Sequence, residues 1–335
     1  MRNVLSKKLM GGLASLLLVC GSIGSAEAGS GADARLKIFS PSPPSVMLHQ
    51  LNLTLGQKLN DCGIQNTVIP LALPDSINQF SSGDSEKKKT ELPIVTTIDF
   101  FPAVHRKGPS WHSYAKPNTD LKFVASLYDV AFGVLAFDKS IKNPEDLKGK
   151  RIGAPPRPSA VRVFTEALLR DGWGILDDVE IVDIYPPALI GAVTRGEIQA
   201  TTWNLVTQSA NGVSAVVPDL LELENGAWLE ADEEAVRAMN EASAFEVDIT
   251  YLQSDAEAQT ALFSFRQALA AWEATPDETI TNILSCMTDG NPISGDLYSD
   301  IDELAKWPGL DAMQVHRAAL AFYRKRGSVI FENNQ

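Results

Sequence analysis

The segment that decides the fold runs from Asn143 to Trp203. It reads NPEDLKGKRIGAPPRPSAVRVFTEALLRDGWG and, five residues later, EIVDIYPPALIGAVTRGEIQATTW. Short apolar runs predict strands at 151–154, 179–185 and 198–203. The segments between these strands predict helices at 160–170 and 187–195. Strands that alternate with helices indicate a parallel sheet with right-handed crossovers. Ligands bind at the carboxyl ends of such strands. We therefore expect ligand contacts in the PPRPS loop and at the end of the strand that contains Trp203.

The first 28 residues have the pattern of a secretory signal. A basic start is followed by an apolar run at 9–23 and by an A-x-A cleavage site that ends at Ala28. An uncleaved membrane anchor and a lipoprotein at Cys20 are the alternatives, but the apolar run is short for a membrane span. We therefore expect a periplasmic protein that is cleaved after Ala28.

The composition indicates a globular mature protein and argues against some kinds of partner. The whole chain has 335 residues, 44% hydrophobic and 21% charged, which is typical of a globular protein with room for two domains. Cleavage would leave 26 basic against 41 acidic residues, a net charge of −15. This acidic balance argues against a nucleic-acid partner.

The sequence carries no pattern for a metal or a cofactor. We find no G-x-S-x-G elbow, H-E-x-x-H motif or P-loop, so no catalytic residue, metal or cofactor is expected. His112 has no partner at metal-ligand spacing and is expected on the surface. After cleavage Cys62 and Cys286 remain, and the sequence leaves a disulfide and two buried thiols equally open.

Candidate ligand contacts in the first half lie near two predicted strand ends. The loop SPSPPS (40–45) precedes a predicted helix over 46–59, so Ser42 and Ser45 offer hydroxyls beside its positive N-terminus. Capping of that helix is the alternative role for Ser45. The run LPIVTTIDFF (92–101) predicts a buried strand. Near its end, Asp99 is either a ligand contact or a turn and capping residue, and Phe100 belongs to the same candidate loop.

Tyr128 lies where the chain is expected to cross between domains. Two predicted strands, 121–127 and 130–137, follow each other with no helix between them. Tyr128 is a candidate ligand contact, with a core tyrosine whose hydroxyl is hydrogen-bonded as the alternative.

The second half contributes four candidates. Arg157 would offer a guanidinium fork to an anion, and a solvent-exposed loop arginine is the alternative. Ser159 is placed to cap the helix over 160–170, which Asp171-Gly172 ends. Trp203 would pack against an apolar part of a ligand, with a core tryptophan as the alternative, and Asn204 follows it.

Six segments occur in a characteristic order: INQFSSG (77–83), SLYDVAFGVLAF (126–137), IKNPEDLKGKRIGAP (141–155), TEALLRDGWG (165–174), ALIGAVTRGEIQATTW (188–203) and VHRAALAFYRKRGSV (315–329). This ordered set resembles the TAXI family, the solute-binding receptors of TRAP transporters. The resemblance implies an α/β, two-lobed type II periplasmic-binding-protein fold, in which each lobe is a mainly parallel sheet flanked by helices, with hinge strands between the lobes. Lobe 1 would comprise residues 29–129 and about 240–335, and lobe 2 residues 130–239. It also implies that 261–272 forms a strand, although its alanines favour a helix.

Two loops depart from that family. Its glycine-rich first loop is replaced here by SPSPPS, and its Gly-Ser-Gly-Thr-like turn by PPRPSA. Both turns normally offer backbone amides to a carboxylate, and proline has no N–H. The ligand preference of this chain is therefore expected to lie in its proline-rich loops.

These observations predict a receptor that closes around a small, carboxylate-bearing solute and delivers it to a TRAP-type membrane transporter. We expect a monomer that is not an enzyme. The alternatives are an ABC-type receptor of the sulfonate or pyrimidine-precursor kind, a sensory binding protein and an exported enzyme.

Overall fold

The computed structural model describes residues 35–80, 84–107, 109–209, 212–215, 220, 223, 226–253, 259–289, 301–328 and 330, without the side chains of 204–209, 212–215, 253 and 289. The predicted signal sequence lies outside the described residues.

The described strands form one mixed sheet. They are β1 Leu36–Ser40, β2 Asn66–Pro70, β3 Glu91–Thr96, β4 Leu121–Ala136, β5 Arg151–Ala154, β6 Glu180–Asp183, β7 Ala200–Ser209, β8 Gly212–Ala215, β9 Ala227–Leu229, β10 Asp248–Gln253 and β11 Gln259–Trp272. The main path runs β2-β1-β3-β11-β4-β7-β5-β6. Two groups of parallel strands, β2-β1-β3 and β7-β5-β6, are thus joined by β11 and β4.

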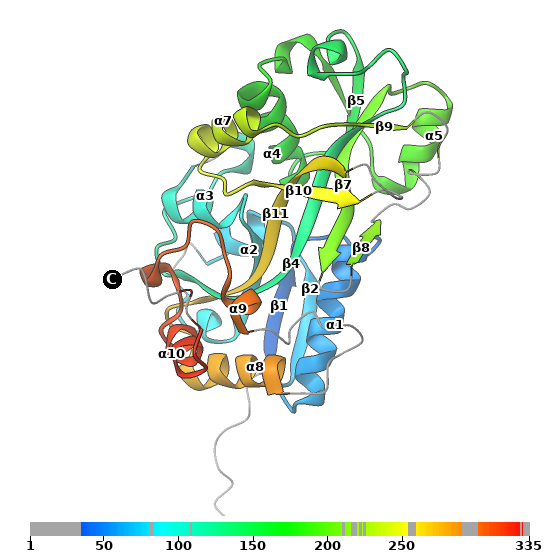
Figure 1. Cartoon of the computed structure of the whole chain (residues 1–335). Helices are drawn as coiled ribbons and strands as arrows, with labels where there is room; N and C mark the ends of the chain where they lie inside the picture. The colour runs from blue at the N-terminus through cyan, green and yellow to red at the C-terminus, as the bar shows by residue number, and fades with distance from the viewer. Residues whose placement is uncertain are drawn as a thin grey trace, which may run out of the picture. The chain divides into compact units, whose positions relative to one another are not determined.

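β4 and β11 run antiparallel to each other through the middle of the molecule (Figure 1). β3 pairs with the carboxyl-terminal part of β11, and β7 with the carboxyl-terminal part of β4. The chain is therefore a two-lobed α/β protein whose lobes share these two long strands, as the fold prediction required.

β4 corrects one expectation. The two strands predicted at 121–127 and 130–137 are one continuous strand of 16 residues. Tyr128-Asp129 does not interrupt it, because both residues pair with Gln267 and Arg266 of β11. Apolar and β-branched residues fill both faces of β4, so no polar alternation marks the middle of the strand.

β11 confirms the strand implied at 261–272 against its helical propensity. Its carboxyl-terminal half, including Ala268 and Trp272, is buried between neighbouring strands. Small alanines fit this crowded position, where β3 and β4 flank the strand on both sides. Tertiary pairing has overridden propensity here.

Helices lie on both sides of the sheet (Figure 1). They are α1 Met47–Asp61, α2 Asp75–Asn78, α3 Phe100–His105, α4 Ala160–Ala167, α5 Leu189–Thr194, α7 Glu233–Ser243, α8 Asp277–Asp289, α9 Ile301–Ala305 and α10 Arg317–Lys325. The helix predicted over 160–170 ends as an α-helix at Ala167 and continues as a π-helical turn to Gly172. The strand predicted over 92–101 was too long, since β3 ends at Thr96 and α3 begins at Phe100.

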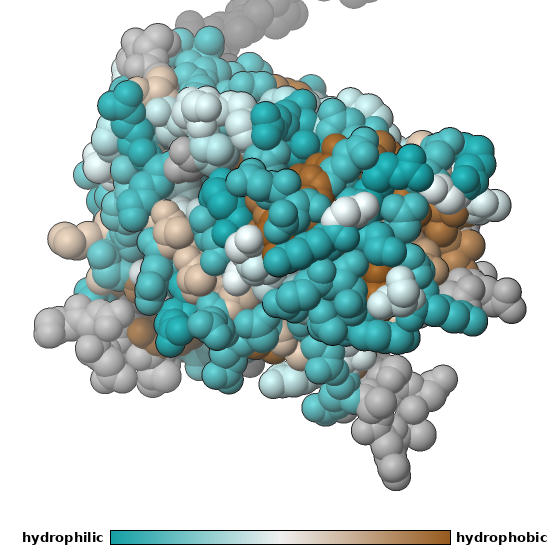
Figure 2. Space-filling view, turned by 90° about the horizontal axis from the view of Figure 1, so that it is seen from above, coloured by the Kyte–Doolittle hydropathy of each residue, from teal (hydrophilic) through white to brown (hydrophobic). Residues whose placement is uncertain are grey.

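Hydrophilic residues cover most of the face shown in Figure 2, with hydrophobic residues in small groups between them. No helix in the described ranges combines the length and the apolar composition that a membrane span requires.

A disulfide resolves the cysteine question that the sequence left open. Cys62, at the end of α1, is bonded to Cys286 of α8, with their Cα atoms 6.0 Å apart. The bond closes a loop over a sequence separation of 224 residues. Long closed loops remove much conformational freedom from the unfolded chain.

Replacing both cysteines by alanine should therefore lower the free energy of unfolding by about 2–5 kcal/mol. Urea denaturation of the double variant and of the wild type, each with and without dithiothreitol, measures this. Reduction should destabilise only the wild type. Equal stability of the oxidised wild type and the double variant would contradict the structural role of the bond.

The tail consists of a short 3-10 turn followed by a helix. A 3-10 turn at Ala312–Gln314 is capped by Asp311, and α10 begins only at Arg317. His316 is the N-cap and is 1% exposed. Its Nδ1 accepts from the backbone N–H of Ala318 at 3.3 Å, and its Nε2 lies 3.2 Å from the carbonyl oxygen of Thr275. This geometry requires the neutral imidazole, with the proton on Nε2.

Burial and the adjacent Arg317 lower the pKa of His316 below its ordinary 6.5. The unfolded chain therefore binds a proton near pH 6.5 that the folded chain does not. Stability from this group is complete above that pH and is lost as the pH falls.

The free energy of unfolding should accordingly decrease between pH 7.5 and pH 5.5. In His316→Asn, which keeps a capping side chain without a titrating group, this dependence should be flatter. Urea denaturation at the two pH values measures the slope. If the variant showed the same slope as the wild type, His316 would not contribute to the pH dependence of the free energy of unfolding.

Candidate ligand-binding site

A cavity of about 180 Å³ lies between the proline-rich loops of the two lobes. Its walls come from the loops after β1 and β2, the loops after β5 and β6, the first turns of α1 and α4, and strands β7 and β11. The lining residues are Pro41, Ser42, Pro43, Val46, Leu48, Ala72, Leu73, Pro155–Val161, Tyr185, Trp203, Phe265 and Gln267. The carboxyl ends of parallel strands from both lobes thus face one space, as the strand–helix pattern predicted.

The cavity suits a small solute with an apolar part. Its volume is below the roughly 300–1,000 Å³ of pockets for drug-sized ligands. Most of its lining is apolar or proline, including the buried side chains of Leu73, Trp203 and Phe265. A wider surface hollow of about 570 Å³ lies between α7 and β10 and is lined mainly by polar and charged residues. None of the predicted ligand contacts borders that hollow.

Two helices begin at the cavity. Val46 immediately precedes α1, and Ala160 and Val161 open α4. The N–H groups of a first helical turn have no partner within the helix and carry partial positive charge. Ser159 is at the N-cap position of α4, but its side chain makes no capping hydrogen bond. Its hydroxyl therefore remains available at the cavity wall.

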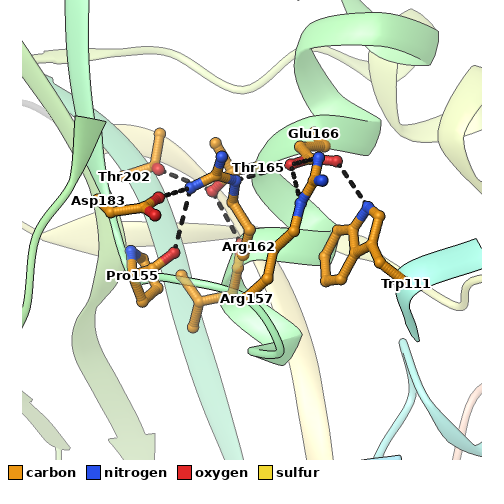
Figure 3. Close-up of polar contacts among 9 residues, drawn as sticks. Trp111, Pro155, Arg157, Arg162, Thr165, Glu166, Asp183 and Thr202 are labelled. Atoms are coloured by element: carbon orange, nitrogen blue, oxygen red, sulfur yellow. Dashed lines mark hydrogen bonds and ion pairs between the residues drawn. The ribbon is translucent and has the colours of Figure 1, made fainter. Parts of the chain in front are cut away.

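Arg157 borders the cavity, but its guanidinium is engaged by another side chain. Nε and Nη2 lie 3.0 Å and 2.6 Å from Oε1 of Glu166. The guanidinium also lies over the ring of Trp111, 4.4 Å from its centroid (Figure 3). Trp111 donates its indole N–H to Oε2 of Glu166 at 3.2 Å. The predicted anion fork is thus paired within the protein, although the side chain is half-exposed.

Glu166 is buried and joins a second arginine to the first. Arg162 Nε donates to the same Oε1 at 2.7 Å, and Arg162 Nη1 reaches Oδ1 of Asp183 at 2.5 Å. The Glu166 and Arg162 side chains are 6% and 10% exposed. Their charges are therefore compensated mainly by each other and by Arg157 and Asp183. The bond from Trp111 connects the segment between α3 and β4 with α4 (Figure 3).

Tyr128 is directly behind the cavity wall. It is 4% exposed, and its hydroxyl lies 2.6 Å from Oε1 of Gln267, 2.9 Å from Oδ1 of Asn52 and 3.2 Å from the carbonyl oxygen of Leu48. Gln267 and Leu48 line the cavity, whereas Tyr128 does not. The structure thus places Tyr128 as a buried tyrosine with a bonded hydroxyl, in contact with residues of the wall.

Asp99 lies outside the cavity in a buried polar cluster. It is fully buried and accepts from the hydroxyl of Thr96, from Nε2 of His112 at 2.9 Å and from the hydroxyl of Tyr114 at 3.3 Å. The expectation of a surface His112 was wrong, because this residue is 2% exposed and paired with Asp99. Burial and the Asp99 carboxylate raise the pKa of Tyr114 well above its ordinary value.

Two further candidates, Ser45 and Phe100, do not line the cavity. Ser45 is exposed and is not the N-cap of α1, since Val46 occupies that position. Phe100 is buried in the core, with its ring centroid 5.9 Å from that of Trp307. Asn204 belongs to β7, but its side chain is outside the described part of the chain. Of the nine candidates, those that line the cavity are Ser42, Arg157, Ser159 and Trp203.

Sequence reasoning missed the contribution of β11 and of the loop after β6. Phe265 and Gln267 alternate along β11 and so project from the same face. A polar residue at that spacing within an alanine-rich strand was the available signal for Gln267. Tyr185, which is 63% exposed, follows β6 as a large aromatic side chain at the cavity edge.

Comparison with known proteins found matches to parts of this chain. A family model described as NMT1/THI5 like matches residues 106–242. The taurine-binding periplasmic protein of Escherichia coli (strain K12) is 46% identical over 71 residues, which are 21% of this chain and 22% of that protein. The match therefore spans about a fifth of each.

Matches among solved structures have low sequence identity and TM-scores below 0.5. MatC from Rhodopseudomonas palustris with bound malate has 14% identity and a TM-score of 0.47, over 75% of this chain and 82% of that chain. The alkanesulfonate-binding protein SsuA from Xanthomonas axonopodis pv. citri bound to MOPS has 16% identity and a TM-score of 0.38, over 76% of this chain and 74% of that chain.

The arrangement around Glu166 predicts unequal effects of two substitutions. Glu166→Ala leaves the buried Arg162 with only the exposed carboxylate of Asp183 as an acidic partner among the described residues and should cost about 3–5 kcal/mol of unfolding free energy. Arg157→Ala removes a half-exposed partner of the same carboxylate and should cost no more than about 1 kcal/mol. Urea denaturation of both variants measures the difference. Equal costs would show that burial of the Glu166–Arg162 pair is not what makes Glu166 important.

Proposed function

We propose that this chain is an exported solute-binding receptor, rather than an enzyme, that encloses a small anion between its lobes and presents it to a membrane transporter. The observation that carries this proposal is the cavity at strand ends of both lobes. Its walls come from loops that lie far apart in the sequence. A ligand there contacts both lobes at once.

Closure of the lobes follows from that arrangement. The lobes share β4 and β11, and small changes of backbone dihedral angles along two strands can change the angle between them. A solute that touches loops of both lobes binds the closed form more tightly than the open one. It therefore shifts the population toward the closed form.

The anionic character of the solute is supported by the polar groups of the cavity. Two helix N-termini and the hydroxyls of Ser42 and Ser159 favour negative charge. Pro155, Pro156 and Pro158 supply apolar contacts but no N–H groups. A carboxylate or a sulfonate with a short apolar body matches this combination of groups.

The transporter partner has two candidates. A TRAP-type transporter follows from the TAXI-like segments. An ABC-type transporter is the second candidate, favoured by the 71-residue similarity to a taurine-binding periplasmic protein. The membrane subunits encoded beside this chain distinguish the two types, and a membrane kinase there in place of a transporter would indicate a sensory role.

The receptor proposal predicts a rise in melting temperature with a small organic anion. A solute at a hundred times its Kd adds about 2.7 kcal/mol to the free energy of unfolding. A thermal-shift panel of taurine, malate, adipate, benzoate and benzenesulfonate tests this, with benzylamine and benzyl alcohol as cationic and neutral controls.

A cavity-filling variant shows where the solute binds. Ala72→Phe places a ring in the cavity and should abolish the shift, whereas Ala242→Phe, on the exposed face of α7, should retain it. The proposal fails if no anion in the panel shifts the wild type, or if Ala72→Phe and the wild type shift equally.

A further inference from the structure

Gln267 has an unusual hydrogen-bonding state for a buried amide. It is 2% exposed and borders the cavity from the middle of β11. Its Oε1 accepts from the Tyr128 hydroxyl at 2.6 Å. Among the described residues, Nε2 has no hydrogen-bond partner. Nε2 is also absent from the fully enclosed, unpaired polar atoms of those residues, so its accessible side faces the cavity.

Tyr128 contacts one end of the Gln267 amide. Of the three oxygen atoms of described residues near its hydroxyl, Gln267 Oε1 is the nearest. Behind Tyr128, Asn52 donates from Nδ2 to the hydroxyl of Ser40 at 2.9 Å, and His49 Nδ1 lies 2.9 Å from the same hydroxyl. With Oε1 at the Tyr128 hydroxyl, the Nε2 end of the amide lies toward the cavity.

An unpartnered buried N–H₂ group is costly unless a ligand or water completes it. We infer that Gln267 Nε2 donates to an anionic oxygen of the bound solute and is a specificity-determining residue of the cavity. This inference rests on the proposed receptor function and narrows its ligand class. The solute has an acceptor oxygen at the β11 wall and an apolar body beside Phe265, Leu73 and Trp203.

The position of Gln267 also couples the ligand to the strands that the lobes share. Gln267 pairs with Tyr128 in the β11–β4 register, and that register shifts between Gln267 and Ala268. Such irregularities often occur beside binding sites, where they redirect a side chain. A solute bound to Nε2 therefore contacts the strand pair that connects the lobes, in addition to the loops of each lobe.

Isothermal titration calorimetry with benzoate and taurine tests the inference. Gln267→Met keeps the length of the side chain but removes both donors. It should weaken anion binding about tenfold to hundredfold, the loss expected for one hydrogen bond to a charged group. Gln267→Glu adds a negative charge and should weaken binding further. Gln259→Met and Gln259→Glu, at an exposed position of the same strand, should bind as the wild type does.

Tyr128→Phe separates positioning from direct contact. It should weaken anion binding in the wild type but have no further effect in the Gln267→Met background, because Tyr128 acts through Gln267. Urea denaturation of each variant shows whether it is folded. If Tyr128→Phe lowered stability equally in the wild type and in Gln267→Met, it would still be expected to weaken anion binding only in the wild type.

The outcomes distinguish the inference from the receptor proposal. If the wild type binds neither these anions nor any other in the panel, the receptor proposal fails and the inference with it. If the wild type binds an anion and Gln267→Met binds it equally well, the inference alone is overturned. Preference for benzylamine over benzoate would also overturn it, because an amine requires Oε1 rather than Nε2 at the cavity.

Discussion

The pairing of β4 with β11 is the constraint on which the rest of the structure depends. The two strands are antiparallel over most of their length, and each also pairs with a strand of a parallel group. Backbone N–H and C=O groups in this buried position must be bonded, so both strands must stay extended where the lobes meet. The same requirement keeps the alanine-rich β11 out of a helix. The pairing also places Gln267 opposite Tyr128, so that the amide of Gln267 forms a polar part of the cavity wall.

The charges near the cavity show why residue type alone does not identify a ligand contact. An arginine in a loop at a strand end is a reasonable anion site, and Arg157 occupies such a loop. Glu166 lies nine residues later, on α4. Its carboxylate accepts hydrogen bonds from that guanidinium and from the buried Arg162. The buried carboxylate depends mainly on Arg162, because water cannot replace a buried partner, and the half-exposed Arg157 is its second partner. Arg157 therefore serves the internal network first.

More of the fold than of the candidate ligand-binding site could be predicted from the sequence. Strand–helix alternation over 143–203 gave the parallel group β5–β6–β7, because local periodicity determines those elements. The continuity of β4 and the strand β11 depend on partners distant in the chain, and local propensity favoured a helix for β11, whereas the family resemblance indicated a strand. His112 illustrates the same limit, since its burial depends on Asp99, thirteen residues earlier, and no periodic pattern connects the two. The pairing of Cys62 with Cys286 likewise requires α1 and α8 to lie side by side.

The proline-rich loops change what kind of group can recognise a ligand. A glycine-rich turn binds an anion through several backbone N–H groups, whereas Pro155, Pro156 and Pro158 remove three such donors from one loop. The donors at this cavity include the first turns of α1 and α4, two serine hydroxyls and the amide of Gln267. The prolines also add apolar surface on both sides of the cavity. Under the proposed receptor function, recognition would therefore rest on side chains of β11 and on helix starts more than on the backbone of the loops. Such a site would select by the position of a few donors and by the shape of an apolar wall, and it would favour a solute with one anionic end and a compact apolar body over a highly charged one.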